Sequence, residues 1–332
     1  MLGSSGKGLD LLDTPVRLTW DLPAVVSGNR ANGQAGVCLS AVAERVADGG
    51  VFFVTLQGKP LLHPALGDVL GVLAGGCQVL ITCYGGSDEL MRFAQLPRAG
   101  CQLLLDVSGF IDAEQGVDTV QGVDIGRLQT VVHELRQQAC EPVLSLTPLR
   151  KNLCYIPDLL RFCSEYRVPE FKLPNAHIGD SFHAYSAADL PRWQDLDNFR
   201  ECWLEFMKEP CQLPAMEIHD LFLWEIMTPG QEKTRSEYGG CQAGNSLGHI
   251  DLLGVVHPCA AWPQPLGQLP SQSLADIWAG RERLAIREHI AGTPDGCRDC
   301  SDLDICFGGC RGLAFHLNRS GGERDLMCSG PR

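Results

Sequence analysis

The sequence predicts an α/β protein in which repeated βα units are followed by a small cysteine-rich region. The chain of 332 residues is long enough for one barrel-sized unit or two unequal domains. Between residues 16 and 175, short apolar runs alternate with segments of helical periodicity, which is typical of a parallel sheet. Seven of the 16 cysteines then fall between Cys241 and Cys328, where the cysteine density more than doubles.

Six strands with helices between them are expected in the first part of the chain. Ser87 is expected to be the N-cap of its helix. Strands are expected at Val16–Trp20, Val51–Leu56, Gln78–Thr82, Gln102–Val107, Pro142–Leu146 and Glu170–Leu173, and helices at Ala41–Ala47, Pro64–Leu73, Ser87–Gln95, Ile125–Ala139 and Ile156–Tyr166. This alternation fits either a partial (β/α) barrel or an open doubly wound sheet.

Composition and charge exclude several function classes. Hydrophobic residues make up 45% of the chain and charged residues 20%, as in an ordinary globular protein. The net charge is −13, and the basic residues do not cluster, so no nucleic-acid partner is expected. No stretch has the apolar length of a membrane-spanning helix or a signal peptide, so we expect a cytoplasmic protein without a membrane partner.

The loop after the second strand carries the first functional signal. Neither phosphate-binding fingerprint is present, and Gly75-Gly76 and Gly85-Gly86 are expected to be turns. The loop itself reads Gln57-Gly58-Lys59-Pro60-Leu. A strand followed by Gly-Gly-Glu-Pro-Leu and a helix is typical of radical S-adenosylmethionine (SAM) enzymes, and this loop resembles that motif with Gln57 and Lys59 substituted. In that family the glutamate contacts the SAM amino group, where a lysine would place like charge.

A second element of that family is missing from the sequence. Radical SAM enzymes carry C-x3-C-x2-C after the first strand to hold a [4Fe–4S] cluster, but this chain has no cysteine before Cys38. One thiolate cannot hold such a cluster. The resemblance therefore implies a degenerate barrel of radical SAM type, a partial (β/α)6 TIM-like barrel that is not expected to bind SAM. The alternative is an ordinary turn at Gln57–Pro60 in an unrelated α/β protein.

The C-terminal cysteines have a distinctive spacing. Cys297, Cys300, Cys306, Cys310 and Cys328 form C-x2-C-x5-C-x3-C-x17-C, while Cys241 is followed by Gly254 and Cys259. Soft thiolates in such a pattern select iron–sulfur clusters or zinc. The spacing matches neither ferredoxin pattern nor the paired C-x2-C sites of structural zinc. Residues Ile250–Gly254 are expected to form a hairpin.

The whole spacing resembles the SPASM domain, a C-terminal extension of radical SAM enzymes that modify peptides. The resemblance implies two auxiliary [4Fe–4S] clusters, one held by Cys297, Cys300, Cys306 and Cys328 and the other by Cys241, Cys259 and Cys310. The second set lacks a fourth ligand, for which His249, Asp251 and His257 are the nearby candidates. The alternative is a zinc-stapled module, although seven cysteines divide poorly into sites of four ligands.

The remaining chain is expected to be structural. Cys77, Cys101, Cys140 and Cys163 are expected to pack in the core, whereas Cys83 lies at a strand end where a site residue can sit. The helix at Asp195–Met207 presents Phe199, Trp203 and Phe206 to the core, and residues 211–238 are expected to be irregular. We expect a flexible tail at 1–14, a barrel at 15–180, a bridging helical segment at 181–240 and the SPASM domain at 241–332.

The resemblance also implies a function. An intact SPASM region beside an altered SAM loop resembles the SPASM-domain component of GeoRSP-type peptide-modification systems. It implies an accessory iron–sulfur protein, without radical initiation of its own, for electron transfer or for binding peptide and partner. Expected partners are an intact radical SAM/SPASM maturase, a precursor peptide and a small peptide-binding protein similar to PqqD. The alternatives are a radical SAM-like oxidoreductase with an atypical SAM site and the zinc-stapled binding module.

Overall fold

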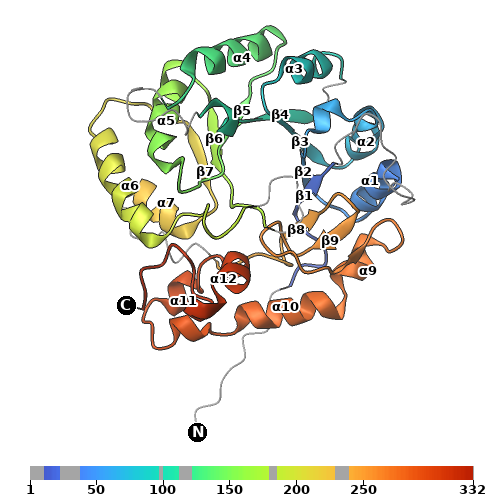
Figure 1. Cartoon of the computed structure of the whole chain (residues 1–332). Helices are drawn as coiled ribbons and strands as arrows, with labels where there is room; N and C mark the ends of the chain where they lie inside the picture. Colours follow the sequence, from blue (N-terminus) through green and yellow to red (C-terminus); the bar gives the residue numbers. More distant parts are fainter. Residues whose placement is uncertain are drawn as a thin grey trace.

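The computed structural model is built on one ten-stranded sheet that curves into a partial barrel, with helices around its outer face (Figure 1). It describes residues 11–22, 38–96, 100–111, 122–178, 185–228 and 239–331. The strand order is β10-β9-β8-β1-β2-β3-β4-β5-β6-β7. The predicted α/β class with a barrel-type parallel sheet is confirmed.

Strands β1 to β7 are parallel to their neighbours along the sheet. Their side chains alternate between the two faces of the sheet. In β1, Leu18 and Trp20 are buried, while Arg17 is exposed. The strands are β1 (Arg17–Asp21), β2 (Phe53–Gln57), β3 (Gln78–Cys83), β4 (Cys101–Asp106), β5 (Val143–Ser145), β6 (Glu170–Leu173) and β7 (Ala215–Ile218).

The connecting helices are amphipathic and pack their apolar faces on the sheet. In α4, Leu128, Val131 and Leu135 recur at helical spacing and are all buried. The helices of this part are α1 (Leu39–Asp48), α2 (Leu66–Leu73), α3 (Ser87–Phe93), α4 (Ile125–Gln137), α5 (Ile156–Glu165), α6 (Trp193–Phe206) and α7 (Leu221–Met227), with short 3-10 turns at η1 (Pro60–Leu62), η2 (Ser108–Phe110) and η3 (Leu153–Tyr155). Throughout the described ranges, none of the helices combines the length and apolarity needed to cross a membrane.

The cysteine-rich region continues the same sheet. Strand β8 (Leu247–Ile250) pairs in parallel with β1, and β9 (Val255–His257) and β10 (Gly267–Gln268) follow in antiparallel order. The expected hairpin after Ile250 is therefore confirmed. The remaining elements are α9 (Leu274–Trp278), α10 (Arg281–Ala291), η4 (Asp295–Cys297), α11 (Leu303–Cys306), α12 (Arg311–Leu317) and η5 (Arg319–Gly321).

Two local predictions are wrong. Residues 211–228 are not irregular, because β7 adds a parallel strand beyond β6 and α7 follows it. The sequence of β7, Ala-Met-Glu-Ile, is partly exposed and lacks the apolar run of a central strand. Ser87 is the first residue of α3 rather than its cap; Gly86 is the N-cap, and its N–H donates to the Glu89 carboxylate at 3.1 Å. Residues 1–10 of the expected tail lie outside the described residues.

A charged network ties the two sides of the barrel together. The Lys172 ammonium of β6 lies 2.8 Å from the Glu217 carboxylate of β7 and 3.0 Å from that of Glu170. Glu217 also pairs with Arg17 of β1 and accepts a hydrogen bond from His219. The carboxylate of Glu217 thus links β6 and β7 to β1.

Candidate metal centres

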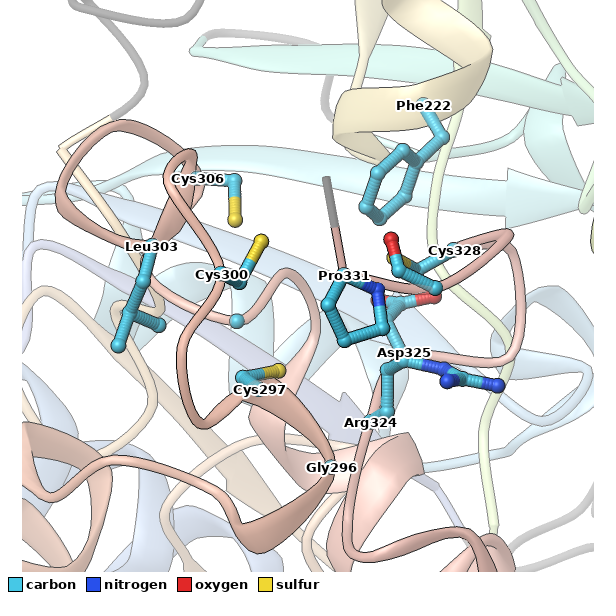
Figure 2. Close-up of a pocket in the computed structure, with 12 residues that line it drawn as sticks. Phe222, Gly296, Cys297, Cys300, Leu303, Cys306, Arg324, Asp325, Cys328 and Pro331 are labelled. Atoms are coloured by element: carbon cyan, nitrogen blue, oxygen red, sulfur yellow. The ribbon is translucent and has the colours of Figure 1, made fainter.

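Four of the predicted cysteines line one pocket. Cys297, Cys300, Cys306 and Cys328 surround it together with Phe222. Figure 2 shows the side chains of the first three turned toward a common space, with Cys328 on the opposite side below Phe222. The cavity between them has a volume of about 10 Å³.

The chain reaches this arrangement through a series of tight turns. The N–H of Cys300 donates to the carbonyl of Cys297 at 3.3 Å, and that of Leu303 donates to Cys300 at 3.3 Å. The short helix α11 then ends at Cys306, and Phe307 adopts a left-handed conformation with φ of 53°. Cysteines close in sequence thereby share one pocket (Figure 2).

The other three predicted cysteines gather beside this pocket. Cys241 precedes β8, Cys259 follows β9 and Cys310 is the N-cap of α12. Burial raises the pKa of the Cys310 thiol well above its usual range, and the negative charges of Cys241, Asp325 and Cys259 add to this effect. Burial, and then the charge of Cys241, raise the pKa of Cys259 to about 12. These mutual effects identify the three thiols as neighbours.

Asp325 lies between the two thiol sets. It lines the four-thiol pocket, and its Oδ2 atom accepts a hydrogen bond of 2.6 Å from the N–H of Cys310. Its Oδ1 atom accepts from the N–H of Met327 at 2.8 Å. Burial raises the pKa of Asp325, and burial together with the nearby Asp325 charge raises that of Asp220. The two sites therefore share a buried carboxylate that sequence reasoning missed.

Buried arginines hold the thiol-bearing loops in place. Nη1 of Arg287 donates to the carbonyls of Cys241 at 2.7 Å and Ala243 at 3.1 Å. Arg311, next to Cys310, donates to the carbonyls of Ile290 and Gly292, both at 2.8 Å, at the C-terminal end of α10. Their carbonyl partners are distant in sequence, so no local pattern identifies these residues. Their contacts join the thiol-bearing loops to α10.

The donor set fits iron–sulfur chemistry. Burial, followed by the charges of Cys328, Cys306 and Cys300, raises the pKa of Cys297 to about 11. A bound metal offsets such repulsion, because it takes up the thiolate charge. Four soft sulfur donors around one pocket match the ligand set of a [4Fe–4S] cluster. Among the described residues, no group of three His, Cys, Asp or Glu side chains is arranged to hold a single metal ion.

The candidates for the fourth ligand lie in a cluster of their own. The rings of His249 and His257 are 5.8 Å apart, and Nδ1 of His249 is 2.8 Å from the hydroxyl of Thr19. Nε2 of His257 lies 3.2 Å from Oδ2 of Asp251. These side chains interact with one another and with β1. These contacts assign none of the three to the second thiol set.

The altered loop after β2 is a glycine-dependent turn. Gly58 has φ of 78°, and a Cβ there would lie 2.7 Å from the carbonyl oxygen of Leu22. Lys59 also has a positive φ of 66°, is exposed, and precedes Pro60 at the start of η1. Its charge acts against the effect of burial, which raises the pKa of the nearby Glu89. Residues 23–37, where the cysteine triplet of radical SAM enzymes is missing, lie outside the described residues.

The other cysteines have mostly structural settings. Cys77, Cys83 and Cys163 are buried, whereas Cys101 and Cys140 are partly buried against the core. Cys83 accepts a hydrogen bond from the N–H of Gly85 at 3.3 Å, within the turn before α3. The expectation of core packing is confirmed for Cys77 and Cys163.

Comparisons with known proteins agree with this geometry. Residues 241–301 match SPASM, an iron–sulfur cluster-binding domain. The fold is similar to Streptococcus suis SuiB, with a TM-score of 0.66 at 16% identity over 96% of this chain and 78% of that one. SuiB bound to its precursor peptide SuiA gives the same TM-score. Native anSMEcpe with bound AdoMet gives 0.59 at 13% identity over 94% of both chains. Residues 241–301 are thus similar to the SPASM domain, and the fold of the chain is similar to that of these structures.

Proposed function

We propose that this chain is an accessory iron–sulfur protein of a peptide-modification system, with two auxiliary [4Fe–4S] clusters and no SAM-cleaving cluster. The observation that carries the proposal is a contrast within the chain. Seven thiols gather into two neighbouring sets in the SPASM region, whereas no cysteine precedes Cys38 to hold a cluster beside β1.

The residues of the two thiol sets have distinct tasks in this proposal. Cys297, Cys300, Cys306 and Cys328 would hold one cluster, and the other three thiols would hold the second with an open fourth position. A bound cluster supplies reversible one-electron chemistry. Asp325 holds Cys310 through its backbone N–H, and the buried arginines fix the loops on either side.

The altered loop after β2 supports the absence of SAM cleavage. Lys59 occupies the position where the resemblance expects a glutamate facing the SAM ammonium, so like charges would meet there. The similar structure of anSMEcpe does contain AdoMet. SAM binding by this chain is therefore a direct test of the proposal.

Peptide handling is the second part of the proposal. The similar structure of SuiB contains a precursor peptide, on a barrel that shares this fold. We propose that this chain pairs with an intact radical SAM/SPASM maturase and helps to hold its precursor peptide, as the SPASM-domain component of a GeoRSP-type system would. A small peptide-binding protein similar to PqqD would complete the set.

The test is anaerobic purification followed by measurement of iron, labile sulfide and zinc, with a SAM titration on the same sample. About eight irons per chain and no SAM binding are expected, as two four-iron clusters require. Clear SAM binding with formation of 5′-deoxyadenosine would overturn the accessory role in favour of an oxidoreductase with an atypical SAM site. Stoichiometric zinc without iron would leave a structural binding module.

A further inference from the structure

We propose that the surface formed by Asp299, Asp304, Ile305 and Phe307 docks a redox protein whose contact face is basic around an apolar centre. We call these four residues the acidic docking face. The inference rests on the proposed function, because it places an electron-carrying site directly behind this surface. It adds the chemistry of the partner and the place where it binds.

The apolar centre of the acidic docking face flanks a cluster ligand. Ile305 is 39% exposed and Phe307 is 43% exposed, whereas Cys306 between them is only 7% exposed. The residues directly before and after a thiol that lines the pocket therefore both carry exposed apolar side chains. Exposed apolar groups that are contiguous and surrounded by polar residues mark interaction sites.

The backbone at Phe307 indicates that its side chain is kept for contact. Its φ of 53° is unfavourable for a bulky residue, and glycine adopts this conformation without strain. The two following residues, Gly308 and Gly309, also have positive φ values and are glycines. An aromatic side chain at this turn costs conformational energy while remaining exposed, which is the pattern expected of a functional contact residue.

Phe307 also lies beside the second thiol set. A Cβ built on Gly240 would be 3.0 Å from the Cβ of Phe307, and Gly240 directly precedes Cys241. Phe307 therefore directly follows Cys306 of the four-thiol set and packs next to Gly240, the neighbour of Cys241 in the second set. A protein bound over Phe307 would be close to both sites, and for this reason we assign the face to a redox partner.

The charge around this centre selects a basic partner. Residues 295–304 contain four aspartates and one arginine, and Arg298 is paired with Asp295 at 2.6 Å. Asp299 and Asp304 are exposed. Arg324 lines the pocket as well but is half-buried. Complementary charge accelerates association and orients the partner, and the net charge of −13 acts in the same direction.

The test uses cytochrome c, a small basic haem protein, as the probe. Chemically reduced protein passes one electron to the oxidised haem, whose Fe³⁺ becomes Fe²⁺, and stopped-flow absorbance follows the second-order rate against ionic strength. Asp299→Asn with Asp304→Asn is expected to lower the rate about threefold at low salt and to flatten its salt dependence. Phe307→Gly, which relieves the strained φ, is expected to lower it about tenfold.

Matched controls separate a local face from general charge and hydrophobicity. Glu44→Gln with Asp48→Asn removes the same charge from the exposed side of α1, and Phe52→Gly removes a phenylalanine that is 64% exposed. The controls are expected to leave the rate within about twofold of the parent. Equal losses in the control and face variants, or unchanged rates in the face variants, would overturn the proposal.

A second readout keeps docking separate from the proposed function. Zinc-substituted cytochrome c, which binds without accepting electrons, is titrated against the same variants, and iron is measured on each sample. Weaker binding in the face variants supports the proposal even if iron is absent, in which case only the proposed function fails. Weaker binding of a Lys/Arg-rich peptide, with unchanged binding of zinc cytochrome c, overturns the redox partner in favour of a basic peptide.

Discussion

The turn after β2 and the thiol-bearing segments around β8 and β9 belong to the same sheet but differ in their side-chain chemistry. The first keeps a glycine-dependent backbone shape, with Gly58 pressed against Leu22, while a lysine stands where the resemblance expects a carboxylate. The second brings seven cysteines together in two neighbouring sets. The contrast illustrates that the backbone geometry of a fold and the chemistry of the side chains on it are separate properties.

Removal of two thiols from the four-thiol set gives the largest expected effect. In the double variant Cys297→Ser and Cys306→Ser, iron is expected to fall by about four atoms per chain, because one cluster loses half its ligands. Iron and sulfide analysis of anaerobically purified protein measures this. The control Cys202→Ser alters an exposed cysteine on α6 and keeps the full iron content. Unchanged iron in the double variant would contradict the ligand assignment.

A smaller effect, on the free energy of unfolding, is expected for a substitution at Gly309, beside Asp325. Gly309 has φ of 66°, and a Cβ there would lie 2.4 Å from Oδ2 of Asp325. Gly309→Ala is expected to lower the free energy of unfolding by about 2–4 kcal/mol, because strain and a clash with a buried carboxylate combine. Gly239→Ala is the control, since Gly239 has a similar φ of 65° but no atom within 4 Å, and about 1 kcal/mol is expected. Urea unfolding measures both free energies. Equal losses in the two variants would contradict a contribution from the contact with Asp325.

Loss of the buried Arg287 guanidinium is expected to destabilise the loop that carries Cys241. Arg287→Met leaves the carbonyls of Cys241 and Ala243 without their donor, and a loss of about 1–3 kcal/mol in unfolding free energy is expected. Arg281→Met changes an exposed arginine of the same helix and is expected to cost less than about 0.5 kcal/mol. Thermal unfolding of both variants tests this, and the prediction fails if they are equally stable.

The smallest expected effect is on the stability contributed by Glu217 in the barrel, and it depends on pH. The hydrogen bond from His219, followed by contacts with Lys172 and Arg17, holds the pKa of Glu217 below its ordinary value of 4.5 despite burial. The resulting stability is present above the unfolded-state pKa and is lost as pH falls through the folded-state pKa. Glu217→Gln is expected to remove about 1 kcal/mol at neutral pH and to flatten the pH dependence below about 4.5. The measurement is the free energy of unfolding of the parent and of Glu217→Gln as a function of pH. Two curves that stay parallel as pH falls would exclude this role of Glu217.

The fold was largely predictable from periodicity, because helices and central strands bury regular apolar faces. Helix α4 is expected at Ile125–Ala139 and observed at Ile125–Gln137. Strand β7 was not predictable, since Glu217 faces the charged network rather than an apolar layer and the strand has only four residues. An edge strand of this kind is defined by its neighbour β6 rather than by its own sequence.

The thiol sets were predictable for a different reason. Cys297, Cys300, Cys306 and Cys310 follow one another closely in sequence, where spacing along the chain determines spacing in the structure. Asp325 and Arg287 were not predictable, because their partners Cys310 and Cys241 are 15 and 46 residues away in sequence. His249 and His257 lie near the ligands in sequence, yet they interact with each other and with Thr19 and Asp251. The contacts of Asp325, Arg287 and His249 join residues far apart in sequence and leave no local signal.

The pairing of β8 with β1 has a consequence for how the chain is made. Thr19 and His249, which face each other in this pair, are 230 residues apart. A ribosome that adds about 5–20 residues per second completes β8 about 10–50 s after β1. During that time β1 has an open edge, which is a template for pairing with other chains. Yield in a host cell should therefore depend on what protects a nascent barrel, such as a chaperone or a partner made at the same time.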